Sequence, residues 1–360
     1  MNSDGNRPEQ DTARLASADE TLLITGASGF VGRRVVTALL SRGYRRLRCL
    51  TRHNRTPAGL QAALEPFPNA NVEVLAGNLL DPAYCRRAAR GVAVVYHLAA
   101  GIDKTFPGCI LNSVVTTRNL LDAIVNDGGV RRFVNVSSFA VYSNERIRWG
   151  GVLDESCMVD TKVADRHDPY AYGKARQDDV VEEYGRGRGL PFVIVRPGIV
   201  IGPGKARIPG RVGIDTFGVF LHLGGGSRMP FTYVDNCADA IALAGLIPGI
   251  DGEVFNIVDD DLPRSREYLR EYKRRVRRIA SIPVPYSAFM AFSYLWEKYS
   301  KYSEGQLPPV FNRRICEIYF KGHRYSNAKA KTLLGWTPRV TMREGLERTF
   351  AASRQTGRDS

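Results

Sequence analysis

The sequence predicts an α/β protein built on a doubly wound parallel sheet, with a smaller C-terminal substrate-binding domain. Short apolar runs alternate with helical patterns from Thr21 onward, and a glycine-rich turn follows the first run. The runs are apolar at almost every position, which is typical of strands covered by helices on both faces. The composition is that of an ordinary globular chain, because 44% of the 360 residues are hydrophobic and 24% are charged.

Six strands are expected before residue 205. They are Thr21–Thr25, Leu47–Thr51, Val72–Ala76, Ala93–Leu98, Phe133–Ser137 and Phe192–Arg196. Helices are expected directly after the glycine turn, around Ser113–Val125 and from about Tyr170 to Tyr184, and Gly252–Val258 adds a later strand. This alternation is the Rossmann pattern, in which the carboxyl ends of parallel strands form a crevice for a dinucleotide.

The chain divides into a nucleotide-binding part and a substrate part. The polar N-terminus is expected to be a disordered tail, and a second tail is expected at the other end. After Gly204 the alternation loosens, which indicates a different domain. The expected segments are a tail at 1–19, the Rossmann domain at 20–204, a region at 205–352 that is mainly substrate domain, and a tail at 353–360. Within the third segment, residues at about 233–258 and 326–350 are expected to return to the core.

Charge and cysteine content restrict the class of protein. The chain carries 51 Lys and Arg against 37 Asp and Glu, a net charge of +14, which favours a phosphorylated cofactor, a nucleic acid or a lipid surface as partner. The six cysteines are scattered without a CxxC pair, so neither a metal site nor a disulfide framework is expected. No signal peptide or spanning segment is recognised, since Pro283 and Pro285 interrupt the long uncharged run Ile279–Trp296. A cytoplasmic location is expected, with membrane-surface contact as an addition.

The glycine-rich turn predicts a phosphate-binding loop. The sequence TGASGFVG places three glycines between the first strand and the first helix. Glycine permits the tight turn and lets backbone amides approach a pyrophosphate, which then faces the positive end of the helix. The expected cofactor-binding residues of this turn are Gly26, Ser28, Gly29, Phe30, Val31 and Gly32.

The end of the second strand favours NADP over NAD. An acidic residue there would bind the ribose hydroxyls of NAD, but this chain has Arg52. A guanidinium pairs with a 2′-phosphate, and Arg33 and Arg34 are near enough in sequence to contribute. The alternative is that Arg52 is a solvated loop charge, which leaves NAD open as the cofactor.

Three further residues form a candidate catalytic set. Tyr170 and Lys174 have the YxxxK spacing, which puts both side chains on one face of a helix, one turn apart. Ser138 follows the fifth strand, at the same edge of the sheet as the glycine turn. A free tyrosine is a weak base at neutral pH, and we expect the Lys174 ammonium together with the nicotinamide charge to favour its phenolate. Such a set suits proton transfer at a substrate oxygen, with Tyr170 as acid or base and Ser138 orienting that oxygen.

The glycine turn and this triad resemble the extended short-chain dehydrogenase/reductase family, of the NAD-dependent epimerase/dehydratase type. The resemblance runs from about Thr21 to Phe350 and includes the ordered stretches GNL, YHLAA, RPG, YVDN and LGWTP. Its nearest branches are the 3β-hydroxysteroid dehydrogenase-like and dihydroflavonol reductase-like ones. The resemblance implies that Lys174 reaches the nicotinamide ribose and that the enzyme is a homodimer through the helices near Ser113 and Tyr170. It implies further cofactor contacts at Asn78, Leu79, Leu98, Ala99, Ala100, Pro197 and Ile199.

Departures from the family pattern bear on the reaction. Phe139 and Ala140 stand where nucleotide-sugar dehydratases carry an acidic pair, so the proton relay for water elimination is missing. Ile199 and Ile201 stand where nucleotide-sugar enzymes have Asn and Tyr. Residues 264–278 are strongly basic, and an aromatic stripe follows. Together these segments favour an apolar substrate and contact with an anionic membrane surface through 264–300; the alternative is that the stripe packs on the core. The stripe comprises Phe289, Phe292, Trp296 and Tyr299.

The sequence therefore predicts an NADP-dependent oxidoreductase acting on a secondary alcohol or ketone of a hydrophobic, sterol- or lipid-like molecule. The alternative within enzymes is a nucleotide-sugar epimerase that retains NAD. The remote alternative is a non-catalytic nucleotide sensor or nucleic-acid-binding module. An intact triad and the lack of a nucleic-acid motif oppose it, so no nucleic acid is expected as partner.

Overall fold

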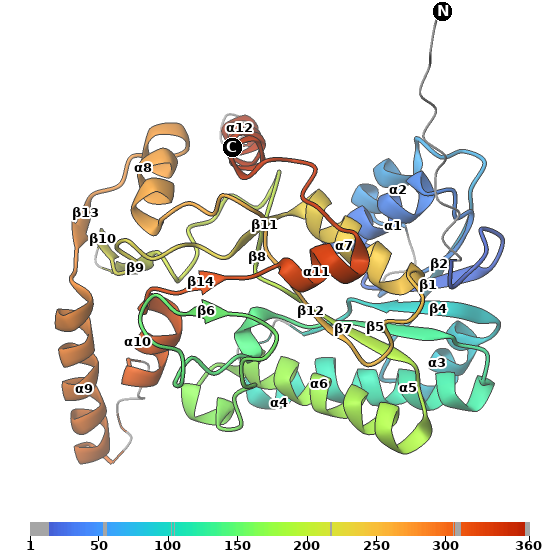
Figure 1. Cartoon of the computed structure of the whole chain (residues 1–360), viewed down its shortest axis with the longest axis horizontal. Helices are drawn as coiled ribbons and strands as arrows, with labels where there is room; N and C mark the ends of the chain where they lie inside the picture. The colour runs from blue at the N-terminus through green and yellow to red at the C-terminus, as the bar shows by residue number, and fades with distance from the viewer. Residues whose placement is uncertain are drawn as a thin grey trace, which may run out of the picture.

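The computed structural model describes residues 14–52, 56–101, 103, 105–216, 218–304, 306 and 311–356. Its centre is a seven-stranded parallel sheet in the order β12-β7-β5-β4-β1-β2-β3 (Figure 1). The chain starts in the middle of the sheet and winds outward twice, so the strand order reverses between β1 and β4. The strands are β1 (Thr21–Thr25), β2 (Arg46–Thr51), β3 (Asn71–Ala76), β4 (Val92–His97), β5 (Arg132–Val136), β7 (Phe192–Pro197) and β12 (Val254–Ile257).

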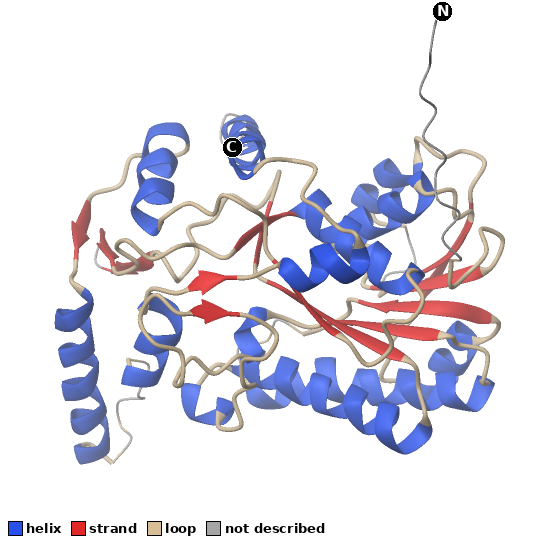
Figure 2. Ribbon diagram, viewed as in Figure 1, coloured by secondary structure: helices blue, strands red, loops and turns tan. Residues whose placement is uncertain are grey.

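Helices cover both faces of this sheet (Figure 2). Alternate residues of β1 point to opposite faces, so Leu22 and Ile24 join one apolar cluster and Leu23 joins the other. The first cluster includes α1 (Gly32–Ser41), α2 (Ala58–Leu64), α7 (Val234–Leu246) and α11 (Ala328–Leu334). The second cluster includes α3 (Pro82–Ala89), α5 (Thr116–Asp127) and α6 (Pro169–Arg188). A buried core therefore lies on each side of the sheet.

The remaining elements lie beyond the carboxyl ends of the sheet strands. They form small sheets, β13-β10-β9, β11-β8 and β14-β6, with helices packed around them. The strands are β6 (Val152–Leu153), β8 (Ile199–Ile201), β9 (Gly213–Thr216), β10 (Val219–His222), β11 (Phe231–Tyr233), β13 (Ser281–Pro283) and β14 (Arg324–Tyr325). The helices are α4 (Phe106–Cys109), which a π-helix at Ile110–Val115 continues, two 3₁₀ helices at Phe139–Val141 and Val163–Arg166, α8 (Ser265–Arg275), α9 (Tyr286–Tyr302), α10 (Arg313–Phe320) and α12 (Met342–Thr356).

The six strands expected before residue 205 are confirmed, each ending within one residue of its predicted limits. The run Gly252–Val258 supplies the edge strand β12, which pairs with β7. The expected N-terminal tail is wrong for residues 14–19: Ala16 is 2% exposed, and the Leu15 amide donates to the Leu246 carbonyl at 2.9 Å. Residues 1–13 and 357–360 lie outside the described residues, and α12 continues to Thr356, beyond the expected end of the folded part.

Some side chains of the aromatic stripe pack against other rings, and others are exposed to solvent. Phe289, Phe292 and Trp296 surround Phe311, with ring centroids 6.1, 5.5 and 5.4 Å from its own. Tyr299, by contrast, is 54% exposed. Packing on the core therefore holds for Phe289, which is 7% exposed, whereas Phe292 is 43% exposed despite its ring contacts. Across the described residues, no helix combines the length and the apolar character needed to cross a membrane.

Candidate active site

The turn between β1 and α1 requires glycine at two positions. Gly26 has φ of 66°, and a Cβ there would lie 3.1 Å from the backbone nitrogen of Ala99. A Cβ on Gly32 would collide with the carbonyl oxygen of Gly26. The turn therefore folds tightly back on the end of β4 and packs α1 against it, which leaves a backbone cradle that a side chain would fill.

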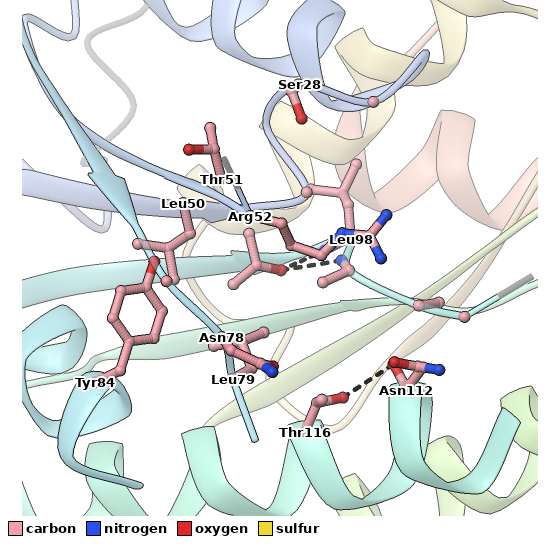
Figure 3. A pocket seen from close by; sticks show the side chains of 17 residues that line it. Ser28, Leu50, Thr51, Arg52, Asn78, Leu79, Tyr84, Leu98, Asn112 and Thr116 are labelled. Atoms are coloured by element: carbon pink, nitrogen blue, oxygen red, sulfur yellow. Dashed lines mark hydrogen bonds between the residues drawn. The ribbon is translucent and has the colours of Figure 1, made fainter. Parts of the chain in front are cut away.

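A pocket of about 250 Å³ opens beside this turn, at the carboxyl ends of β1, β2, β3 and β4 (Figure 3). This is the edge at which the strand order reverses, where the fold places its ligand. Nine of the predicted cofactor residues line it: Gly26, Ser28, Gly29, Arg52, Asn78, Leu79, Leu98, Ala99 and Ala100. It is also lined by residues that the sequence analysis did not select, namely Thr25, Leu50, Thr51, Gly77, Tyr84, Gly101, Asn112 and Thr116.

The other predicted cofactor residues lie elsewhere. Phe30 contacts the amine of Lys205, 5.0 Å from its ring centroid. Val31 packs against the core, and Pro197 is buried at the end of β7. Of the residues missed, Thr25, Thr51 and Gly77 stand at or directly after strand ends, a signal that the sequence did contain.

Arg52 is exposed and lines the pocket at the end of β2, where a cofactor-selecting side chain is expected. Its two suggested helpers do not reach this pocket. Arg34 forms an ion pair with Asp235, with 3.4 Å between Nε and Oδ1, and Arg33 lies over the Phe30 ring at 6.0 Å. The suggestion that Arg33 and Arg34 add to the pocket is therefore wrong.

Ser138 and Tyr170 meet at a second pocket, of about 240 Å³. Both side chains line this pocket together with Ile199, and the Ser138 hydroxyl is near enough to affect the pKa of Tyr170. Tyr170 is placed by the start of α6, where the carboxylate of Asp168 accepts a hydrogen bond from the Ala171 amide at 3.1 Å. The serine and tyrosine predicted to act together are thus brought together.

Lys174 lies one helical turn below Tyr170 and is 3% exposed. Its ammonium donates to the Val136 carbonyl at 2.6 Å and to Oε1 of Gln177 at 2.9 Å. Burial lowers the pKa of Lys174 to about 8, although the charge of Asp178 opposes this shift. Burial also raises the pKa of Tyr170, while the hydrogen bond from Ser138 opposes the rise. In the chain by itself, desolvation dominates and favours the neutral phenol. The expected effect of Lys174 together with the nicotinamide charge stays a prediction for the enzyme with its cofactor bound.

A buried chain of hydrogen bonds connects Lys174 to the glycine turn. Gln177 donates from Nε2 to the Thr117 hydroxyl at 2.9 Å, and this hydroxyl lies 2.8 Å from Nε2 of His97. His97 Nδ1 lies 2.9 Å from the Thr25 hydroxyl. The Thr25 oxygen also accepts from the amides of residues 98 and 99, at 3.1 and 3.0 Å. The lysine and the cofactor pocket are therefore parts of one polar network.

His97 is neutral in this network. Burial lowers its pKa to about 3, and the charge of Lys174 adds to this effect. Thr25 accepts two amide hydrogen bonds, so its own hydrogen is free for His97 Nδ1, which leaves the imidazole proton on Nε2 facing Thr117. A buried neutral histidine with both nitrogens satisfied positions its neighbours and does not transfer protons to a substrate.

The residues present fit a dinucleotide. The glycine cradle offers backbone amides, the pocket lies at the switch point of the sheet, and Arg52 offers a cation at its far end. A bound nicotinamide would supply the hydride acceptor or donor. Within the described segments, no three His, Cys, Asp or Glu side chains cluster as a metal ion would require.

The family model of the NAD-dependent epimerase/dehydratase family matches residues 22–257. The chain belongs to this family. It is therefore an enzyme of the extended short-chain dehydrogenase/reductase type, which sets aside the non-catalytic alternative. The doubly wound sheet and the glycine turn described above are the structural basis of this membership.

Curated relatives are distant. A protein named 3beta-hydroxysteroid-dehydrogenase/decarboxylase isoform 2, from Arabidopsis thaliana, is 26% identical over 359 residues, covering 91% of this chain and 61% of the relative. Cinnamoyl-CoA reductase 1 from Oryza sativa subsp. japonica is 33% identical over 189 residues, covering 51% of this chain and 54% of the relative. The chain thus spans less than two thirds of the length of either relative.

Solved structures share the fold. The dTDP-glucose 4,6-dehydratase from Streptomyces venezuelae, with NAD and TYD bound, gives a TM-score of 0.69 at 24% identity, covering 93% of this chain and 97% of that chain. UDP-glucuronic acid 4-epimerase from Bacillus cereus, in complex with NAD, gives a TM-score of 0.66 at 21% identity. The match covers 93% of this chain and 99% of that chain. At this identity the likeness establishes the architecture alone.

Proposed function

We propose that this enzyme is an NADP-dependent oxidoreductase that moves a hydride to or from a secondary alcohol or ketone of a hydrophobic, sterol- or lipid-like molecule. The observation that carries the proposal is that Ser138 and Tyr170 line the same second pocket, with the buried Lys174 one turn below Tyr170 on α6. A substrate oxygen placed between the two hydroxyls would be oriented and supplied with a proton at one point.

Each residue of the set has one task in this proposal. The Ser138 hydroxyl donates to the substrate oxygen and so holds the reacting carbon in place. The Tyr170 hydroxyl gives its proton to that oxygen during reduction and takes it back during oxidation. The buried ammonium of Lys174 favours the phenolate that this exchange produces. Since Lys174 has three N–H groups and donates two to Val136 and Gln177, one remains for the cofactor or the tyrosine.

The position of Arg52 supports NADP as the cofactor. Its guanidinium lines the dinucleotide pocket at the end of β2 and is exposed there. An adenosine 2′-phosphate at this place would form a charge-assisted hydrogen bond with it, whereas the two hydroxyls of NAD would leave the cation unused.

The walls of the second pocket support an apolar substrate. Phe139, Ala140, Ile199, Pro209 and Pro230 line it beside the two hydroxyls. The proposal includes peripheral contact with an anionic membrane through residues 264–300, since Leu295 is 65% exposed and Tyr299 is 54% exposed there. It also includes a homodimer through the helices near Ser113 and Tyr170.

The test is a comparison of two tyrosine variants. Tyr170→Phe removes the acid and base, and we expect kcat to fall about 10²- to 10⁴-fold while NADPH binding persists. Tyr172→Phe is the matched control. Tyr172 lies on another face of α6, where its ring packs edge-on against Phe106 of α4, so this variant should retain activity. Turnover is followed by NADPH absorbance with sterol-like ketones. Near-native activity of Tyr170→Phe would contradict the proposal.

A nucleotide-sugar epimerase with retained NAD is the second candidate, because the matching family model is that of NAD-dependent epimerases and dehydratases. Mass spectrometry of the cofactor released on denaturation separates the two candidates. NAD released in equal amount to the protein favours the epimerase. Exchangeable NADP, together with turnover of a ketone, favours the reductase.

A further inference from the structure

Arg211 stands in the same pocket as the two reacting hydroxyls. It precedes β9 and lines the pocket of about 240 Å³ with Ser138 and Tyr170, although it is far from both in sequence. The guanidinium is held in place from α10: Nη1 donates to the Ile318 carbonyl at 2.8 Å, and the Tyr319 ring centroid lies 5.1 Å from its central carbon. The cation is therefore a fixed part of the pocket wall.

This cation forms no ion pair in the part of the chain that the structure describes, whereas other partly or fully buried arginines nearby do. Arg166 and Arg314 share Asp160, and Arg196 pairs with Asp178. A half-buried guanidinium without a counter-charge favours the arrival of an anion.

Asp168, the carboxylate that lines the same pocket, is already engaged. Its Oδ1 accepts from the Ala171 amide at 3.1 Å, and its Oδ2 accepts from the Tyr319 hydroxyl at 3.0 Å. The field of Arg211 also reaches His323: burial, Arg211 and Lys321 together lower the pKa of that histidine to about 4. Asp168 therefore directs its carboxylate to the Ala171 amide and the Tyr319 hydroxyl and forms no ion pair with Arg211.

We propose that Arg211 binds a carboxylate of the substrate, so that the natural substrate is an apolar hydroxy or keto acid. This inference rests on the proposed function and specifies its substrate class. The planar guanidinium matches a carboxylate in two parallel hydrogen bonds. A carboxylate suits the site better than a phosphate dianion, because Asp168 would repel the second charge. The apolar walls then receive the rest of the molecule.

The test measures binding of two ketone probes that differ only in charge, 4-acetylbenzoate and its methyl ester, by NMR titration of the full chain. The native protein should bind the acid about tenfold more tightly than the ester, and added salt should weaken only the acid. In Arg211→Gln the acid should lose this preference while the ester binds as before. Arg207→Gln, an exposed cation of the same loop, is the control and should retain the preference.

Failure of the inference and failure of the proposed function are distinguishable here, because binding needs no turnover. Tyr170→Phe should still prefer the acid. Equal or absent binding of acid and ester by the native chain overturns the role of Arg211, and so does a preference that survives in Arg211→Gln. If Arg211→Gln does not fold, two other measurements test the role of Arg211. One is the comparison of acid and ester binding by the native chain, and the other is Arg211→Lys, which keeps the charge and should keep part of the preference for the acid.

Discussion

The two pockets of this enzyme are built in different ways. The dinucleotide pocket comes from one turn and the ends of adjacent parallel strands, so its residues follow directly from the order of the sheet. The substrate pocket draws single side chains from distant segments: Ser138, Tyr170, Ile199, Arg211 and Tyr319. The difference teaches that the position of the dinucleotide pocket depends on the strand order of the sheet. The substrate pocket depends instead on how the later segments of the chain pack against the sheet.

The surroundings of the two pockets differ as well. The dinucleotide pocket is bordered by the glycines of the turn and by a buried chain of hydrogen-bonded side chains. On the substrate side α9 runs along the edge of the molecule, with Leu295 and Tyr302 exposed to solvent (Figure 1). We therefore expect the first region to be intolerant of small changes and the second to tolerate large ones. The predictions below test this contrast.

The largest effect is expected for Gly32→Ala. The new methyl group would collide with the Gly26 carbonyl, so the turn must shift, and the free energy of unfolding should fall by about 3 kcal/mol or more. The control is Gly187→Ala on the exposed end of α6, where no atom lies within 4 Å of the added carbon; it should leave stability unchanged or raise it by up to about 1 kcal/mol. Urea unfolding measures both, and equal losses would contradict the contrast.

A smaller effect is expected for acid stability through His97. Its folded-state pKa of about 3 lies below the ordinary value of about 6.5, so the unfolded chain takes up a proton as the pH falls while the folded chain does not. Stability from this group is complete above about pH 6.5 and is reduced by about 2 kcal/mol near pH 5.

The variant His97→Asn removes this titration. Urea unfolding at a series of pH values should therefore show a shallower loss of stability between about pH 6.5 and 5 than in the native chain. The slopes are compared, since the substitution also changes stability at neutral pH. Identical slopes would show that the histidine titrates normally.

The cofactor preference should change with Arg52→Asp. Loss of the cation and gain of a carboxylate should lower kcat/KM with NADPH relative to NADH by about 10- to 100-fold, the size of one charge-assisted hydrogen bond. Arg33→Asp is the control, since Arg33 lies against Phe30 and not in the pocket. An unchanged ratio in Arg52→Asp would remove the assignment of NADP.

The smallest effect on stability is expected on the outer face of α9. Replacing Leu295 and Tyr302 together by Ser should change the free energy of unfolding by no more than about 0.5 kcal/mol per site. The same double variant should lose binding to vesicles that contain phosphatidylserine, measured by flotation. Native-like flotation of the variant, or no flotation of the native chain, would remove the proposed membrane contact.

The strands and the turn that form the first pocket could be predicted from the sequence because their signals are local. Apolar runs mark the strands, the glycines mark the turn, and the YxxxK spacing places Tyr170 and Lys174 on one helix. The roles of Arg211, Gln177 and Thr117 could not be predicted, because each depends on contacts across elements that are far apart in the chain. The direction of the tyrosine pKa shift also could not be predicted, since burial, which only the packed structure specifies, outweighs the opposing effect of Ser138.

Asp178 connects α6 to two strands of the sheet. Its carboxylate accepts from Asn135 and Ser137 on and just after β5, both at 2.8 Å, and from Arg196 of β7 at 3.1 Å. The helix that carries the tyrosine and the lysine is thereby locked against sliding or rolling on the sheet. These buried contacts keep Tyr170 and Lys174 at a constant distance from the strand ends, so a substitution at Asp178 would loosen the helix without touching either side chain.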